Sequence, residues 1–323
     1  MRKEPLSERA WGLQERVLSR RVLHFGSEQM YWECLEGFET EEGLKLPFRL
    51  PAVSTDPEII AYMKERELDN AHSFGGTDKS TTHMQTWSHI LSKYGRRKLG
   101  NPQDKLPAIS GVARSFSKEL NDEYLAGLWR KSLIEGLCWQ PLNCKPAEGG
   151  YRAPSWSWAS VDGVPATGFI GDHVEEQANI LETKVDIDGE NPFGRVHDGW
   201  IKVEAPLVKM VLSENKGPTG HILLRSEKGE GDFYAMLDTI DRSYDSSAGL
   251  IQSMELYALI LAFTYGSPFH SDSERKEPIA HGLIVTPATD RPGRLRRIGM
   301  VVQSPAYFGP GELEVSRSTV IVV

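Results

Sequence analysis

The sequence predicts an α+β protein, with a helical first half and an antiparallel, β-rich C-terminal region. Apolar residues recur at helical spacing up to about residue 137, whereas short β-branched and aromatic runs alternate with turn residues from residue 151 onward. At 323 residues, 39% of them hydrophobic, the chain is long enough for more than one domain and apolar enough to bury a core. We expect three segments: residues 1–35, 36–150 and 151–323.

The first segment is expected to start with a helix and continue as a hairpin. Ser7 is a suitable N-cap for a helix that ends near Leu18. Residues 21–25 and 29–34 follow as two short strands, because β-branched and aromatic residues flank a Gly-Ser turn. Residues 35–55 mix glycine and proline with charges and are expected to form a loop.

Four helices are expected in the middle segment. Asp56 followed by proline predicts the start of the first, and residues 73–78 form a loop before the others. Asp104 precedes the third helix, and Asn121 or Asp122 precedes the fourth. The apolar stripes of the last three helices are Trp87, Ile90, Leu91 and Tyr94; Ile109, Val112, Ala113 and Phe116; and Leu125, Leu128, Trp129, Leu133 and Leu137.

The C-terminal segment reads as many short strands separated by glycine and proline turns. This spacing is typical of an antiparallel sandwich or barrel, and pairing of the last strand would hold the C-terminal end in place. The expected strands are residues 201–205, 208–212, 222–224, 256–263, 282–285, 298–302 and 319–323.

Composition excludes several classes of protein. The net charge of −8 argues against a protein that gains affinity by neutralising nucleic-acid phosphates. The three cysteines lack the spacing of a metal site or a disulfide framework, so no metal is expected. The chain shows neither a signal peptide nor an apolar run that could span a membrane. We therefore expect a cytoplasmic protein that binds neither membranes nor nucleic acid.

Motifs for catalysis are missing from the sequence. It contains no nucleophile elbow, no phosphate-binding loop and no paired-histidine metal motif, so we expect no catalytic residue and no cofactor. Glu15 lies beside apolar residues and is a candidate base with a raised pKa. The alternative is a local structural role, which we favour because one carboxylate without a partner group defines no reaction.

Trp156 and Trp158 alternate with serines after Pro154. At strand spacing both indoles would point to one face, which suits a platform on which a ligand stacks. The same spacing also suits two bulky core rings that cover the junction between the helical and β regions. We favour the core role, because indoles bury much area and Pro154 restricts the chain that enters the strand.

Several strings together carry a resemblance to one family. They are RAWGLQERVLSRRVLHF at 9–25, WEC at 32–34, the helix at 87–94, DKLPAISGVA at 104–113, YLAGLW at 124–129, YRAPSWSWAS at 151–160, LYAL at 256–259, GL at 282–283 and RIG at 297–299. In residues and in order, they resemble the last block of the fungal heterokaryon-incompatibility (HET) domain and the region that follows it. The family-motif residues are Trp11, Gln14, Glu15, Arg16, Arg21, Trp32, Cys34, Asp104, Lys105, Pro154, Trp156 and Trp158, with structural roles favoured over functional ones.

The resemblance implies a fold and a role. The HET domain is related to TIR-type α/β domains, so residues 1–35 would be the incomplete C-terminal end of a TIR-like α/β fold. Two upstream blocks of the family, reading roughly LSYxWG and IDALCINQ, have no counterpart in this sequence. The family acts in non-self recognition and programmed cell death in fungi, and this chain would keep a non-catalytic interaction or regulatory part that binds protein partners.

Two other functions remain open. One is a TIR-like NAD hydrolase whose N-terminal part was lost through a gene-model error, and the other is a ligand-binding module built on Trp156 and Trp158. If residues 1–35 are the end of an incomplete domain, the apolar face of the first helix, with Trp11 and Leu13, is expected to be left uncovered. We therefore expect partial disorder or self-association through residues 1–34.

Overall fold

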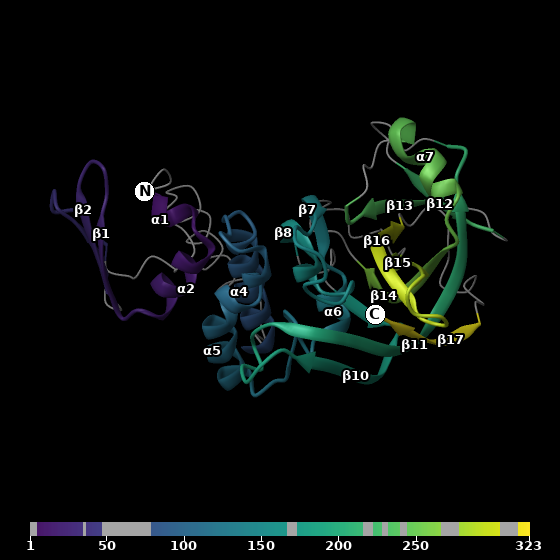
Figure 1. Cartoon of the computed structure of the whole chain (residues 1–323), viewed down its shortest axis with the longest axis horizontal. Coiled ribbons are helices and arrows are strands. Elements are labelled where there is room, and N and C mark those ends of the chain that lie inside the picture. The colour runs from purple at the N-terminus through teal and green to yellow at the C-terminus, as the bar shows by residue number, and fades with distance from the viewer. Residues whose placement is uncertain are drawn as a thin grey trace. The chain divides into compact units, whose positions relative to one another are not determined.

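The computed structural model confirms an α+β protein and divides it into two compact units, residues 1–121 and 122–323 (Figure 1). The sequence predicted boundaries near residues 35 and 150 instead. The residues whose structure is described are 5–34, 37–46, 79–166, 173–215, 222–227, 232–239, 244–265, 278–303 and 316–323.

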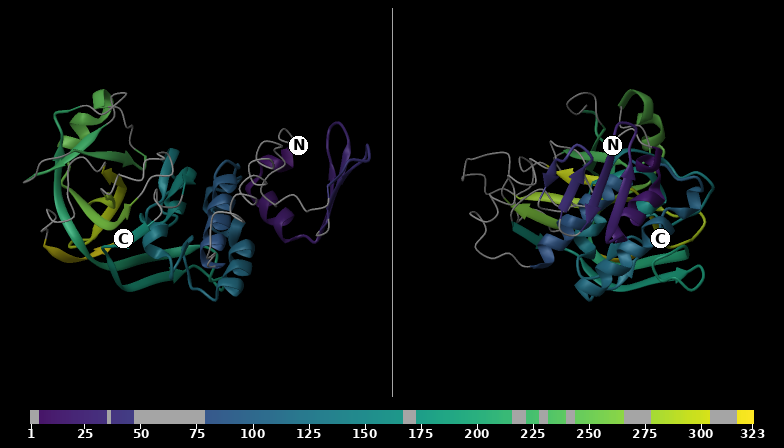
Figure 2. Two further views of the ribbon diagram at one scale, coloured as in Figure 1. Left: turned by 180° about the vertical axis from the view of Figure 1, so that it is seen from behind. Right: turned by 90° about the vertical axis from the view of Figure 1, so that its left-hand side faces the viewer.

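The first unit combines short helices with a small antiparallel sheet. Its helical elements are α1 (Pro5–Glu8), α2 (Ala10–Leu18), α4 (Lys79–Tyr94), η1 (Pro102–Asp104), η2 (Pro107–Ile109) and α5 (Ser110–Leu120). The sheet has the order β1 (Arg21–Phe25), β2 (Met30–Cys34), β3 (Gly37–Thr40) and β4 (Lys45–Leu46), and its purple strands are seen face-on in the right-hand view of Figure 2.

Backbone hydrogen bonds join the start of the first unit to the end of α4. The amide of Ala10 donates to the carbonyl of Lys98 at 2.9 Å, and the amide of Lys98 donates to the carbonyl of Glu8 at 2.7 Å. Leu13 is fully buried on α2, which packs against η2 and α5. The expectation that the apolar face of this helix is left uncovered is therefore wrong at Leu13, because α5 provides the packing surface.

Several local predictions for the first unit hold and others fail. The strands around residues 21–34 and the helix over residues 87–94 are confirmed. Ser7 is not an N-cap, because it lies inside α1 and Arg9 precedes α2. The loop expected over residues 35–55 is wrong for residues 37–46, which pair as β3 and β4. The expected helix at Asp56 and the loop at residues 73–78 lie outside the described residues.

The second unit begins with a tight hairpin where the sequence predicted a helix. β5 (Tyr124–Leu125) and β6 (Leu128–Trp129) pair around Ala126 and Gly127, both with positive φ, and α6 is short (Leu133–Leu137). Asp122 does not cap a helix, since its carboxylate accepts from the amide of Lys131 across the hairpin at 3.2 Å. Two consecutive left-handed residues are typical of a two-residue hairpin turn and are incompatible with an α-helix.

Most of the second unit is one antiparallel sheet that closes on itself. The remaining elements are β7 (Gln140–Pro146), η3 (Trp158–Ser160), β8 (Val161–Ala166), β9 (His173–Glu176), β10 (Asn179–Ile187), β11 (Val196–Leu212), β12 (Leu223–Ser226), β13 (Asp232–Leu237), α7 (Tyr244–Gln252), β14 (Leu256–Tyr265), β15 (Ile279–Pro287), β16 (Leu295–Gln303) and β17 (Arg317–Val322). Strands β11, β12, β13, β16, β15 and β14 pair in that order, and β14 pairs back with β11. The strands expected from the sequence all correspond to strands of the structure, but residues 201–205 and 208–212 belong to the single strand β11. The closure matches the barrel alternative.

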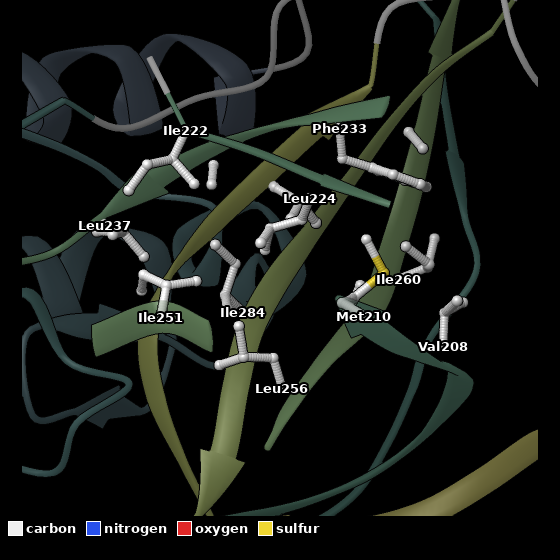
Figure 3. Close-up of a cluster of buried hydrophobic side chains, with 14 of the residues drawn as sticks. Val208, Met210, Ile222, Leu224, Phe233, Leu237, Ile251, Leu256, Ile260 and Ile284 are labelled. Carbon is white, nitrogen blue, oxygen red and sulfur yellow. The ribbon is translucent and has the colours of Figure 1, made fainter. Parts of the chain in front are cut away.

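The length of β11 lets it serve two pairings. Its first half pairs with β10 and with β17, whereas its second half pairs with β12 and β14. The C-terminal strand is thereby held in place, as the sequence predicted. Inside the closed ring, aliphatic and aromatic side chains from every strand pack together (Figure 3), including Met210, Leu224, Phe233, Ile260 and Ile284.

Replacing Gly127 by alanine is expected to lower the free energy of unfolding by roughly 3 kcal/mol. Gly127 has φ +104, and an added Cβ would lie 2.5 Å from Nε1 of Trp158. Gly189→Ala is the matched control, because its φ is +96 and no heavy atom lies within 4 Å of an added Cβ. It is expected to lose only about 1 kcal/mol. Equal losses in chemical unfolding would contradict the steric account.

Candidate functional site

A buried carboxylate lies between the sheet and α2 of the first unit. The side chain of Glu33 on β2 is completely buried, and its Oε2 accepts from Nε of Arg16 at 3.0 Å. Nε2 of His24 on β1 lies 2.9 Å from the same oxygen. Sequence reasoning singled out Arg16 but neither Glu33 nor His24.

The electrostatics of this cluster favour the anion. Burial by itself raises the pKa of Glu33, but the hydrogen bond from His24 and the charge of Arg16 outweigh burial, so the pKa lies below its ordinary value of 4.5. A carboxylate that is held ionised by two partners is a poor general base at neutral pH. The arrangement therefore suits a structural ion cluster more than proton transfer.

The family-motif residues on α2 contact the segment near α5. Nε1 of Trp11 donates to Asp104 at 3.3 Å, and Oε1 of Gln14 accepts from the amide of Gly111 at 2.6 Å. Glu15, the candidate base, is exposed. Its backbone carbonyl accepts from the Ser19 hydroxyl at 2.7 Å. Because the residue is exposed, its carboxylate lies in no apolar pocket.

The other motif residues of the first unit have different surroundings. Arg21 and Trp32 lie on the exposed face of the sheet, and Cys34 is half-buried and carries no disulfide. Lys105 is buried, with its Nζ 5.7 Å from the centre of the Tyr94 ring. The carbonyl of Lys105 accepts from the Tyr94 hydroxyl at 2.6 Å, so this residue fixes the end of α4.

Trp156 and Trp158 are core residues of the second unit. Both side chains are buried, which leaves no face on which a ligand could stack. The expected strand spacing is wrong, since Trp158 begins the 3-10 helix η3 and Ser157 caps it. Nε1 of Trp158 donates to the carbonyl of Gly127 at 2.9 Å, and Pro154 is buried against Gly199.

A third buried indole completes this cluster. Nε1 of Trp139 donates to the carbonyl of Trp156 at 2.9 Å, and the guanidinium of Arg297 lies 3.5 Å from the centre of the Trp139 ring. Arg297 is itself buried on β16. The predicted core role of the tryptophans is therefore confirmed, but they pack within the second unit, against the hairpin region, and not between a helical and a β region.

The side chain of Arg297 is hydrogen-bonded to two other segments, Asp238 and residues 137–139. Its Nε and Nη2 donate to the carboxylate of Asp238 at 3.0 and 3.1 Å. Its Nη1 and Nη2 donate to the carbonyls of Leu137 and Trp139 at 2.6 and 2.7 Å. A buried guanidinium is stable only when its donors are satisfied in this way. Sequence reasoning included Arg297 in a family string but did not identify its partners.

A cavity of about 500 Å³ lies beside this network. Its walls include the paired Arg297 and Asp238, and Tyr151 lies half-exposed among the lining residues. Two further ion pairs line it, Arg291 with Asp198 at 2.6 Å and Arg296 with Asp290 at 2.9 Å. The cavity has both polar and apolar walls, and Arg291, Arg296 and Arg297 each pair with a neighbouring carboxylate.

The titration of the lining groups follows from these pairs. Partial burial raises the pKa of Asp198, but the hydrogen bond and charge of Arg291 outweigh it, so the net pKa is lowered. Burial raises the pKa of Tyr151 well above its ordinary range, and the charge of Asp198 adds to this effect. At neutral pH the tyrosine is a neutral hydrogen-bonding group and no nucleophile.

Within the described ranges, no group of three or more histidine, cysteine, aspartate or glutamate side chains is arranged to hold a metal ion. None of the helices seen in these ranges has both the length and the apolar character that crossing a bilayer requires. Comparison with protein-family models, with curated proteins and with solved structures finds no match for this chain.

Glu33→Gln is expected to lower the free energy of unfolding by roughly 2–3 kcal/mol at neutral pH, because a neutral amide leaves the charge of Arg16 unbalanced. Since the native pKa of Glu33 is lowered, its stabilisation is present above about pH 4.5 and is lost as the pH falls through the native pKa. The difference between wild type and variant should shrink in acid. Urea unfolding across this range measures it.

Glu15→Gln is the matched control, because it removes an exposed carboxylate from the same region. It is expected to change the free energy of unfolding by less than about 0.5 kcal/mol. A loss at Glu15 as large as the loss at Glu33, or a Glu33 effect that does not depend on pH, would contradict the ion cluster.

Arg297→Lys is expected to lower the free energy of unfolding by roughly 3–5 kcal/mol, because an ammonium cannot satisfy the carboxylate of Asp238 and two carbonyls together. Arg296→Lys, on the same strand and half-exposed, is expected to change stability by about 0.5 kcal/mol. Thermal unfolding of both variants measures the difference. Equal midpoints would show that the buried network contributes little.

Proposed function

We propose that this chain is the C-terminal portion of a fungal HET-family protein, which acts in non-self recognition through protein contacts and has no catalytic activity of its own. The first unit would contain the end of the TIR-like α/β domain, and the protein would act in the cytoplasm. The order of the resembling strings supports this assignment. We expect its partners to be proteins, with no cofactor involved.

The observation that carries the proposal is the contact between α2 and the start of α5. The last HET block contributes Trp11 and Gln14, and the downstream string contributes Asp104 and Gly111. These pairs join residues 93 and 97 positions apart in the sequence. Such contacts are expected if the two strings belong to one functional unit, because side chains at that separation meet only through the fold.

The state of the carboxylates supports a role without catalysis. Glu33 is bound by Arg16 and His24, and Asp104 accepts from Trp11. A hydrolase would need a carboxylate or another base that can reach a substrate. The burial of Trp156 and Trp158 argues in the same way against a ligand-stacking module.

Expression of the chain in a fungal host is expected to slow or arrest growth. The double variant Trp11→Phe with Gln14→Ala removes both contacts with the α5 region and is expected to abolish the arrest. Glu15→Ala changes an exposed neighbour on the same helix and is expected to retain it. Growth curves, with the amount of each protein measured in the same cells, test this.

Two results would overturn the proposal. One is normal growth with the wild-type chain at full expression. The other is cleavage of NAD⁺ by the purified chain, because this would assign the enzymatic alternative. If NAD⁺ is cleaved, the variant Glu33→Gln shows whether the buried carboxylate is responsible.

A further inference from the structure

The sheet of the first unit turns large apolar side chains outward. On β1, Leu23 is 46% exposed and Phe25 is 75% exposed. On β2, Met30 is 38% exposed and Trp32 is 40% exposed. Side chains on a half-buried antiparallel sheet ordinarily have the opposite arrangement, with the apolar residues inside.

These four side chains form one continuous patch. Leu23 lies directly opposite Trp32, and Phe25 lies directly opposite Met30, so the four belong to two neighbouring cross-strand pairs on one face. We call this set the outer patch. A contiguous exposed apolar patch of this kind on a small unit marks an interaction site or an association liability.

Charges border the outer patch on two sides. Arg21 lies on the same face of β1, one pair beyond Leu23. On the other side, Trp32 lies opposite Glu39 of β3, which pairs with Lys45 of β4 at 3.0 Å. The face thus carries the basic Arg21 at its β1 edge and, beyond β2, the acidic Glu39 followed by its ion-pair partner Lys45.

We propose that the outer patch binds the outer patch of a second copy of this chain, about a two-fold axis that runs parallel to the strands between β1 and β2. This axis exchanges the two strands, so Leu23 of one copy packs on Trp32 of the other and Phe25 packs on Met30. An apolar centre with a polar rim results, as in stable protein interfaces.

The charged residues at the rim of the outer patch are compatible with the same axis. Glu39 of one copy comes to lie beyond the β1 edge of the other, one row from Arg21, within reach of that long side chain. The two charges have opposite signs, so the rim is attractive on both sides of the axis. An axis perpendicular to the strands would instead bring the β3 edges of the two copies together and leave Arg21 away from Glu39 of the second copy.

The size of the patch predicts a weak dimer. Stable interfaces bury about 800 Å² per partner, and four partly exposed side chains supply less than this. We expect a dissociation constant of roughly 10–100 µM. The proposal rests on the geometry of the sheet alone, so it holds or fails independently of the HET-family assignment.

Sedimentation velocity of the full chain over a range of concentrations tests the dimer. The wild type is expected to dimerise, and Phe25→Ser with Trp32→Ser is expected to remain monomeric. Leu181→Ser and Leu250→Ser are matched controls, since these leucines are 49% and 53% exposed on the second unit. They should dimerise as the wild type does.

A charge exchange tests the axis. Arg21→Glu is expected to weaken dimerisation about tenfold, and adding Glu39→Arg in the same chain is expected to restore it, because opposite charges again meet at the rim. Three results would each overturn the proposal: a wild type that stays monomeric, association that survives the loss of Phe25 and Trp32, or a double charge variant that stays as weak as Arg21→Glu. A wild type that stays monomeric would indicate that the outer patch binds a different protein.

Discussion

The buried guanidinium of Arg297 is the interaction on which the arrangement of the second unit depends. It joins β16 to Asp238 after β13 and to the carbonyls of Leu137 and Trp139 after α6. The amide of the same residue donates to the hydroxyl of Ser155, which also contacts the last residue of the chain. Apolar burial is not directional. The hydrophobic core of the closed sheet could therefore not by itself fix where the preceding hairpin and the tryptophans pack. The guanidinium fixes this position, because an unsatisfied buried charge would cost several kcal/mol.

The sequence predicts most strands of the closed sheet, because each is a local pattern, but it misses β13 and divides β11 in two. Residues 256–263 and 298–302 are apolar runs between turns, and no distant residue is needed to recognise them. Closure of the sheet depends on the pairing of β11 with β14, which the local pattern does not specify. The helix expected over residues 121–137, of which only residues 133–137 are helical, has a similar origin. Its apolar stripe is buried in either structure, and only the left-handed pair at Ala126 and Gly127 decides for the hairpin.

For the candidate site, the resemblance pointed to several residues that do make specific contacts, such as Trp11 and Gln14. It did not identify the carboxylates that pair with the buried arginines. Asp238 lies 59 positions before Arg297, and nothing local to either residue identifies the other as its partner. Glu33 could not be identified from the sequence for another reason. A single carboxylate in a short strand is ordinarily placed on the solvent side, and sequence patterning offers no sign that a helix will supply an arginine to it.

The inverted sheet of the first unit connects these observations. On β1 and β2 the ionised Glu33 is inside, whereas Phe25 is outside. Turning the sheet over would bury Phe25, but it would separate Glu33 from Arg16 and His24. Among the described residues, the ion cluster is therefore kept while the apolar side chains of the outer patch stay exposed. Covering that face with a second sheet removes the conflict, since both faces are then satisfied, and this is the physical reason to expect a partner at this surface.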